Sequence, residues 1–243
     1  MKIVIKDNYQ ELSEKAALLI KEAILNNPKL VLGLATGSTP LGTYKRLIEM
    51  YQEGEISFAE VTIFNLDEYF GLAPDHPQSY NYFMKHNLLS KIDINYDNFY
   101  IPDGLTDDPD KSSLEYEEKI KKFNGIDLQI LGIGSDGHIG FNEPGTSFSS
   151  RTHLANLASS TIKDNSRFFE NEREVPSQAM TMGIATILEA KEILLLASGI
   201  NKSEICAKLI DASKDIMLPA SALKEHDNVT ILLDKEAASQ IKT

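Results

Sequence analysis

Residues 29–40 read KLVLGLATGSTP and contain the pattern from which the fold can be predicted. The first half is a short, almost continuous apolar run, which is typical of a strand that is buried on both faces. A turn of small residues follows it. Pro40 is then well placed to begin a helix, because the first helical turn tolerates proline. A buried strand that passes directly into a helix indicates a parallel sheet covered by helices.

The same alternation recurs along the chain. Apolar runs rich in Val, Ile and Leu predict strands, and apolar residues at three- and four-residue steps predict helices. We expect strands at residues 29–35, 61–66, 98–102, 127–133, 192–198 and 228–233. We expect helices at residues 9–26, 40–52, 79–91, 111–123, 201–212 and, as a further candidate, 219–224. These elements predict an α/β fold built on a three-layer, doubly wound, mostly parallel sheet of the Rossmann-like type.

The length and apolar content suit a single α/β domain that spans residues 1–243. One segment interrupts the alternation of strands and helices. Residues 146–180 mix Ser, Thr, Arg, Asn and Glu with too many apolar residues for a flexible linker. Long connections in compact domains are usually lids or disordered segments. We expect this one to be an active-site lid that contains a short helix.

Composition excludes several classes of partner. The formal net charge of −12 argues against a nucleic-acid ligand, because the phosphate backbone binds to a basic surface. No apolar stretch is long enough for a membrane-spanning helix, and the N-terminus does not resemble a signal peptide. Cys206 is the only cysteine, so neither an intrachain disulfide nor a thiolate metal cluster can form. We expect a cytoplasmic protein with no nucleic-acid or membrane partner.

Four unusual loops follow predicted strands, at residues 35–39, 67–69, 134–138 and 198–202. In an open parallel sheet, ligands bind beyond the carboxyl ends of the strands. The four loops are therefore predicted to surround one ligand.

The first of these loops has the composition of an anion site. Thr36, Gly37 and Ser38 lie between a strand and a helix N-terminus, where backbone N–H groups and hydroxyls can converge on a phosphate. A phosphate also requires cations, for which Lys202 and Arg167 are candidates. The alternative is a tight turn with a capping hydroxyl, and ordinary surface charges at the two basic positions.

The second loop brings two carboxylates, Asp67 and Glu68, to the end of an apolar run. At least one is expected to face the ligand, where partial burial would raise its pKa and let it act as a general base at carbon. The alternative is that Asp67 caps the following turn.

The third loop, GIGSDGHIGFNEPG at residues 132–145, combines acidic groups, a histidine and glycines. Flanking carboxylates at Asp136 and Glu143 would fix the tautomer of His138 and raise its proton affinity, as a proton shuttle requires. The same three residues could bind a metal ion, which is our second interpretation. A glycine-rich turn with an incidental histidine is the third.

Together these motifs resemble those of the glucosamine-6-phosphate deaminases. The resemblance covers nearly the whole chain and rests, in order, on LGLATGSTPLGTY, FNLDEYFGL, SYNYFM, LGIGSDGHIGFNEPG, SSRTHLANL, NSRFF and TMGIATIL. The related 6-phosphogluconolactonases share the fold and a Gly-rich Asp-Gly-His loop. FNLDEY and IGFNEPG, however, are similar to the deaminase form.

The resemblance implies conversion of glucosamine 6-phosphate and water into fructose 6-phosphate and ammonia. It implies that Asp67 moves a proton between C2 and C1 of the open-chain sugar, and that His138 is the acid-base group of ring opening. Asp136 and Glu143 would orient His138 and tune its charge. The phosphate of this small-molecule substrate would be held by Thr36, Gly37, Ser38, Arg167 and Lys202. No metal and no cofactor is implied, because isomerisation itself turns the amine into an imine.

Two other functions stay open: hydrolysis of 6-phosphogluconolactone, and sugar-phosphate sensing without turnover. Lactone hydrolysis needs no base at C2, so Asp67 favours the deaminase.

The sequence departs from part of the family. Longer hexameric members are activated by N-acetylglucosamine 6-phosphate at a site between subunits, which uses basic residues after the catalytic loop and an extended C-terminal tail. The corresponding positions here are His153 and Ala155, and the sequence ends soon after its last predicted strand. We expect a monomer or weak dimer that this ligand does not activate.

Overall fold

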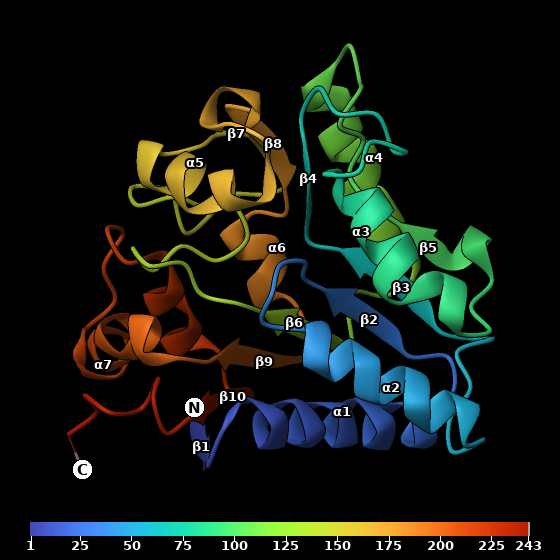
Figure 1. Ribbon diagram of the computed structural model, residues 1–243. Coiled ribbons are helices and arrows are strands. Elements are labelled where there is room, and N and C mark those ends of the chain that lie inside the picture. Colours follow the sequence, from blue (N-terminus) through green and yellow to red (C-terminus); the bar gives the residue numbers. More distant parts are fainter. Residues whose placement is uncertain (243) are drawn as a thin grey trace.

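The computed structural model describes residues 1–242 and contains a seven-stranded sheet in which every neighbouring pair of strands is parallel. The strand order is β1-β10-β9-β6-β2-β3-β5 (Figure 1). The strands are β1 (Lys2–Lys6), β2 (Val31–Leu34), β3 (Thr62–Asn65), β5 (Phe99–Tyr100), β6 (Leu128–Leu131), β9 (Glu192–Ala197) and β10 (Val229–Asp234). This order confirms the predicted α/β fold.

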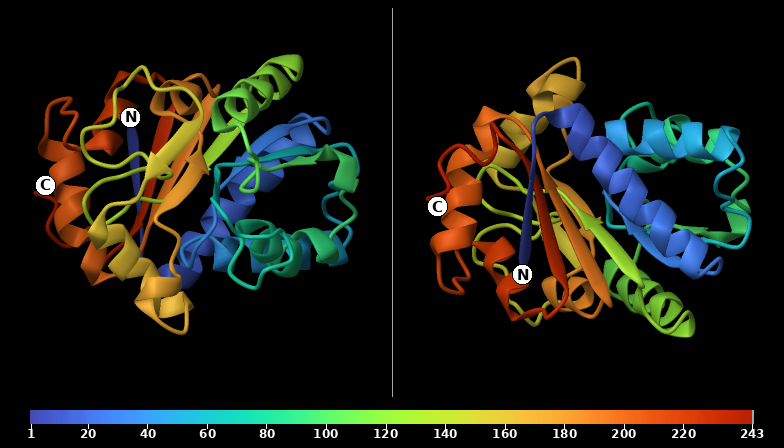
Figure 2. Two further views of the ribbon diagram at one scale, coloured as in Figure 1. Left: turned by 90° about the horizontal axis from the view of Figure 1, so that it is seen from above. Right: turned by 90° about the horizontal axis from the view of Figure 1, so that it is seen from below.

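Helices cover both faces of the sheet, and Figure 2 shows α1 and α2 on the opposite side from α7. One face packs against α1 (Tyr9–Asn26), α2 (Leu41–Gln52) and α3 (Tyr80–Asn87). The other packs against α4 (Pro109–Lys122), α6 (Ile184–Leu188) and α7 (Ser203–Asp211). The predicted three layers are therefore present.

Strand β9 shows why the central strands are apolar throughout. Ile193 and Leu195 belong to the core on the side of α7, whereas Leu194 and Leu196 belong to the core on the side of α1. Successive side chains of a strand point to opposite faces, so a strand between two helical layers is buried at every position.

A second sheet, which the sequence pattern did not indicate, lies beyond the carboxyl end of β3. It contains β4 (Asp67–Tyr69), β8 (Gln178–Thr181) and β7 (His153–Asn156), in the order β4-β8-β7 and with antiparallel pairing. Only Leu66 separates β3 from β4. The chain thus passes directly from the parallel sheet into the small sheet at Asp67.

The predicted lid segment, residues 146–180, is ordered by this small sheet. It contains β7, the helix α5 (Ser159–Asn165), two 3₁₀ turns (Ser166–Phe168 and Glu172–Glu174) and most of β8. The expected short helix is therefore α5.

Several predicted boundaries differ from the structure. The helix expected at 219–224 is a 3₁₀ helix (Pro219–Glu225), and the helix expected at 79–91 ends at Asn87 and is followed by a 3₁₀ turn (Leu89–Lys91). A 3₁₀ turn (Ile200–Lys202) precedes α7, and another (Tyr96–Asn98) precedes β5. Within residues 1–242, no helix combines the length and apolar character that crossing a bilayer requires.

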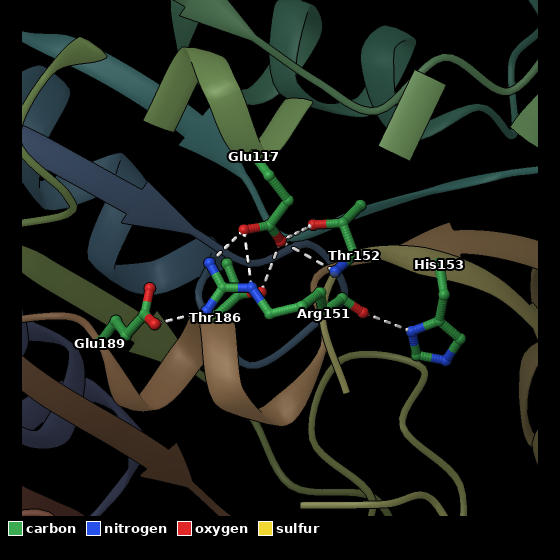
Figure 3. A network of polar contacts seen from close by, with 6 residues as sticks. All are labelled: Glu117, Arg151, Thr152, His153, Thr186 and Glu189. Carbon is green, nitrogen blue, oxygen red and sulfur yellow. Dashed lines mark hydrogen bonds and ion pairs between the residues drawn. The ribbon is translucent and has the colours of Figure 1, made fainter. Parts of the chain in front are cut away.

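A largely buried carboxylate, Glu117 of α4, joins the small sheet to the helices beside it (Figure 3). It accepts hydrogen bonds from the backbone N–H of Thr152 at 2.8 Å and from the hydroxyl of Thr186 in α6 at 2.6 Å. It also pairs with the guanidinium of Arg151, which bonds in turn to Glu189. Three elements distant in sequence are held together at this point, just before β7.

Candidate active site

A cavity of about 560 Å³ lies at the carboxyl ends of β2, β3, β6 and β9. All four predicted loops contribute to its wall, as expected for ligand sites in parallel sheets. Seven of the nine predicted site residues line it: Thr36, Gly37, Ser38, Asp67, His138, Arg167 and Lys202. The other two, Asp136 and Glu143, lie behind His138 and contact its ring.

The loop after β2 is held by hydrogen bonds from two tyrosines of the neighbouring helices α1 and α2. The hydroxyl of Tyr44 in α2 donates to the carbonyl of Ala35 at 2.5 Å. The hydroxyl of Tyr9 in α1 lies 3.1 Å from the carbonyl of Ser38 and accepts from the N–H of Gly42 at 2.8 Å. Gly37 has a φ of 95°, a backbone conformation that favours glycine. The backbone of the loop is therefore held by hydrogen bonds to two helices, which suits an anion site.

Lys202 lies at the end of a loop that the buried carboxylate of Asp234 holds in place. Asp234, at the end of β10, accepts from the N–H of Gly199 at 3.0 Å, from the N–H of Ala237 at 2.8 Å, and from the hydroxyl of Ser198. Sequence analysis missed Asp234, although a carboxylate at the end of a buried strand was a usable signal. Its contacts fix the loop that ends at Lys202.

Lys202 and Arg167 form the cationic part of the wall. Burial lowers the pKa of Lys202, and the nearby Arg167 acts in the same direction, against the carboxylate of Asp164. Two neighbouring cations of which one is partly buried are suited to a doubly charged ligand such as a phosphate.

Asp67, the first residue of β4, is 5% exposed and lines the cavity. Burial raises the pKa of its carboxyl to about 8, and the neighbouring carboxylate of Glu68 adds to this effect while His138 opposes it. A carboxyl with such a pKa is a stronger base than an ordinary aspartate, which suits proton abstraction from carbon.

Glu68 has a different role. Its carboxylate accepts from the backbone N–H groups of Tyr69 at 2.8 Å, Tyr80 at 2.8 Å and Asn81 at 2.9 Å. The last two belong to the first turn of α3, so Glu68 caps that helix. Of the two adjacent carboxylates, Asp67 alone lines the cavity.

His138 lies between two carboxylates. Its Nδ1 atom is 2.8 Å from Oδ1 of Asp136 and 3.5 Å from Oε2 of Glu143. Burial alone would lower the pKa of His138, but the two carboxylates outweigh burial and raise it to about 9. Burial likewise works to raise the pKa of Asp136, but His138 outweighs it and the pKa is lowered to about 2. At neutral pH the ring is therefore an imidazolium held by negative charge.

Gly134 explains part of the glycine content of this loop. A Cβ atom at this position would lie 2.2 Å from Cε1 of His138. Only glycine allows the imidazole to pack directly against the backbone after β6.

The metal interpretation fits this geometry less well. Asp136, His138 and Glu143 do each offer a ligand atom within 4.8 Å of the others. Two ligands of one tetrahedral zinc ion, however, lie about 3.3 Å apart at the usual bond lengths. The 2.8 Å between Nδ1 and Oδ1 is shorter than this and is typical of a direct ion pair between an imidazolium and a carboxylate.

Comparison with known proteins identifies the family of the chain. Residues 6–232 match the family model of the glucosamine-6-phosphate isomerases/6-phosphogluconolactonase. The chain belongs to this family. A glucosamine-6-phosphate deaminase of Clostridium tetani (strain Massachusetts / E88) is 56% identical over 241 residues, 99% of this chain and 100% of the relative. Another, of Thermoanaerobacter sp. (strain X514), is 54% identical over 241 residues, 99% of this chain and 95% of the relative.

Solved structures of the family divide into a near and a distant group. A structure described as a monomeric glucosamine-6-phosphate deaminase is 46% identical, with a TM-score of 0.97, and the match covers 99% of this chain and 100% of that one. The 6-phosphogluconolactonase of Trypanosoma brucei is 23% identical with a TM-score of 0.79, covering 99% and 98% of the two chains. The second likeness shows the shared fold alone.

The cavity is also lined by residues that sequence analysis did not name. Aromatic side chains form one wall of the cavity, where the rings of Tyr80 and Phe141 stack with centroids 5.9 Å apart. Ser135, in the loop that carries His138, donates a hydrogen bond to Asp164 of α5 at 2.8 Å. This contact spans two segments far apart in sequence, so no local pattern could have indicated it.

Proposed function

We propose that this protein converts glucosamine 6-phosphate and water into fructose 6-phosphate and ammonia. The observation that carries the proposal is a buried carboxylate, Asp67, whose pKa is raised to about 8 and which shares a cavity with a charged histidine and two cations. The deaminases at 54% and 56% identity support the same activity. A base at carbon is what isomerisation requires.

The phosphate of the substrate binds where the loop of Thr36, Gly37 and Ser38 faces Arg167 and Lys202. Backbone N–H groups and two cations neutralise a dianion at this end of the cavity. The phosphate takes no part in the chemistry, so its binding energy serves to orient the sugar.

His138 opens the sugar ring. A proton leaves the C1 hydroxyl, the ring oxygen gains a proton, and the C1–O5 bond breaks to give the free aldehyde. His138 is protonated at neutral pH because its pKa is raised to about 9. It is therefore ready to donate a proton to the ring oxygen.

Asp67 then performs the isomerisation. It removes the proton from C2, which leaves an enolamine, and a proton is delivered to C1 to give a ketimine. The ammonium group of the bound substrate favours the ionised carboxylate, since an opposite charge nearby lowers the pKa of an acid. Water adds to the ketimine at C2 and ammonia leaves. C2 is oxidised as C1 is reduced, so atoms and electrons balance without a further reactant.

Two alternatives use the same fold. A 6-phosphogluconolactonase would also bind a sugar phosphate, but lactone hydrolysis does not require a buried base at C2 such as Asp67. A sensor that binds the sugar phosphate without turnover does not require the charged contact between His138 and Asp136. The deaminase accounts for both features.

We expect a monomer or weak dimer from the sequence and infer a monomer, because the deaminase structure at 46% identity is described as monomeric. We also infer that N-acetylglucosamine 6-phosphate does not activate it. His153 and Ala155 stand where activated relatives are expected to carry basic side chains. The ring of His153 contacts the carbonyl oxygen of Arg151 at 2.8 Å, and the guanidinium of Arg151 is engaged by Glu117 and Glu189 (Figure 3). The nearby guanidinium of Arg151 is therefore already paired with carboxylates and is not free to bind the phosphate of an effector. We place the enzyme in the cytoplasm, because phosphorylated sugars do not cross lipid bilayers unaided.

The decisive experiment measures ammonia and fructose 6-phosphate released from glucosamine 6-phosphate by the purified protein in the presence of a chelator. Equal amounts of both products are expected. Absence of both products would overturn the proposal, and hydrolysis of 6-phosphogluconolactone by the same preparation would assign the lactonase activity instead.

A further inference from the structure

Thr161 of α5 combines burial, a position on the cavity wall and a hydroxyl without a partner. Its side chain is 3% exposed, and the residue lines the cavity. Within residues 1–242, Oγ1 of Thr161 makes no hydrogen bond. Asp164 and Asn165, three and four positions further along the helix, line the cavity as well. Residues at these spacings share one helix face, so this face of α5 is turned to the cavity.

A buried hydroxyl without a hydrogen bond is unfavourable and calls for an explanation. The described residues contain seven buried side-chain atoms that lack a hydrogen bond of good geometry. Two belong to residues that line the cavity: Nδ1 of His138, which faces its two carboxylates, and Oγ1 of Thr161. Less than 1 Å² of Oγ1 is accessible, so Thr161 is the hydroxyl in this set that a rotation of its side chain could turn to a ligand in the cavity.

The helix that carries Thr161 is tied to the catalytic loop on both sides of it. Just before the helix, the N–H of Ala158 donates to Oε1 of Glu143 at 3.1 Å. Three residues after Thr161, Asp164 accepts from the hydroxyl of Ser135 at 2.8 Å. Both partners flank His138 in sequence. The helix that carries Thr161 is therefore held against the loop of His138, both residues line the cavity, and Arg167 follows shortly after the end of α5.

We propose that Oγ1 of Thr161 forms a hydrogen bond with a hydroxyl of the sugar chain, between the phosphate and the carbons that react. This inference rests on the proposed deaminase function and adds a substrate-binding residue to it. The hydroxyl can both donate and accept, so it pairs with a sugar hydroxyl in either orientation. The contact fixes the sugar relative to His138 and Asp67.

The test uses Thr161→Val, which keeps the shape of the side chain and removes the hydroxyl. We expect kcat/KM for glucosamine 6-phosphate to fall about tenfold, the usual range for loss of one substrate hydrogen bond. Thermal stability is expected to stay the same or rise, because an unpaired buried hydroxyl is removed. Thr161→Ser, which keeps the hydroxyl, is expected to retain activity within about threefold of the wild type.

Thr43→Val is the matched control. Thr43 is also a buried threonine whose hydroxyl has no partner among the described residues, but it lies on α2 and does not line the cavity. This variant is expected to show wild-type kinetics. If Thr161→Val does not fold, Thr161→Ala and Thr161→Ser are compared, and a loss with Ala that is absent with Ser supports the contact.

Inhibition constants locate the contact on the sugar. Thr161→Val is expected to weaken inhibition by fructose 6-phosphate while leaving inhibition by inorganic phosphate unchanged. Wild-type kinetics in Thr161→Val, or equal weakening of both inhibitors, would overturn the inference. Failure of the proposed function is a separate outcome, since the wild-type protein itself would then release no ammonia.

Discussion

Asp67 and Glu68 are adjacent and both buried, yet they face in opposite directions. The side chain of Asp67 lines the cavity, whereas the carboxylate of Glu68 accepts backbone N–H groups from its neighbour Tyr69 and from the first turn of α3. Successive residues of a strand point to opposite faces, so β4 directs Asp67 to the cavity and Glu68 to the helix on the other side. The hydrogen-bonded carboxylate stabilises the backbone at the point where the reactive carboxylate must be positioned.

The first prediction concerns Asp67→Asn. We expect kcat to fall about 10²- to 10⁴-fold, because the carbon base is lost. Binding of fructose 6-phosphate should persist, since the phosphate site is untouched. Steady-state ammonia release and isothermal titration check the two parts. Asp75→Asn, at an exposed carboxylate, is the control and should behave like the wild type. Turnover near the wild-type rate would show that another group is the base.

The same substitution should change how stability depends on pH. The pKa of Asp67 is raised to about 8 in the folded protein, above its value of about 3.9 in an unfolded chain. The folded state then binds more protons between these values, so the wild type loses stability as pH rises through 8. The amide of the Asp67→Asn variant carries no such charge. Urea unfolding at pH 5 and pH 9 should therefore show a relative gain in stability for the variant at the higher pH.

The pH dependence of kcat/KM should be bell-shaped. Activity rises as Asp67 loses its proton near pH 8 and falls as His138 loses its proton near pH 9. Glu143→Gln removes one of the charges that raise the pKa of His138, so the alkaline limb should move to lower pH. Glu170→Gln, at an exposed site in the lid segment, should leave the profile unchanged. If the alkaline limb of the Glu143→Gln variant stays at the wild-type pH, deprotonation of His138 is not the cause of that limb.

The position of these groups could be predicted because topology places them. Asp67 and His138 follow buried strands, and the carboxyl ends of parallel strands meet at one edge of the sheet. Their local motifs, two carboxylates after an apolar run and a histidine among glycines, are visible without any long-range contact. The charge pair of His138 and Asp136 is also local, since the two residues are two positions apart.

Other features depend on contacts that a single segment does not encode. Strand β1, KIVIK, is a five-residue strand with a lysine at each end, and it lies at a sheet edge where Ile3 and Ile5 are exposed. The short strand β4, DEY, is polar and is a strand only because it pairs with β8. The position of Asp234 at the end of a buried strand is visible in the sequence, but its partner, the loop of Gly199, is not. Pairings of this kind arise from tertiary structure, which overrides local propensity.

A third prediction concerns the two cations. Arg167→Met and Lys202→Met should each raise KM for glucosamine 6-phosphate about 10- to 100-fold, the range for losing a charge-assisted hydrogen bond. The effect on kcat should be smaller, because the phosphate is remote from the reacting carbons. Inhibition by inorganic phosphate should weaken in parallel. Lys163→Met, an exposed position on α5, is the control. Unchanged KM in both variants would place the phosphate elsewhere.

The inferred monomer gives a fourth prediction. Sedimentation equilibrium should return the mass of one chain, about 27.0 kDa. The rate should depend hyperbolically on substrate concentration, with or without N-acetylglucosamine 6-phosphate. Replacing Arg151 by Gln should not create or remove an activator effect, since its guanidinium is already paired with carboxylates. A stable hexamer, or a sigmoidal curve that the acetylated sugar makes hyperbolic, would contradict the prediction.

The last prediction concerns Glu117. In Glu117→Ala, the N–H of Thr152 and the hydroxyl of Thr186 lose a charged acceptor, and Arg151 loses one of its two carboxylate partners. We expect the free energy of unfolding to fall by about 2–3 kcal/mol, measured by urea denaturation. Glu189→Gln removes only the exposed partner of Arg151 and should cost below about 1 kcal/mol. Similar small losses in both variants would mean that Arg151 and water replace the contacts of Glu117, and that the junction before β7 is held by packing alone.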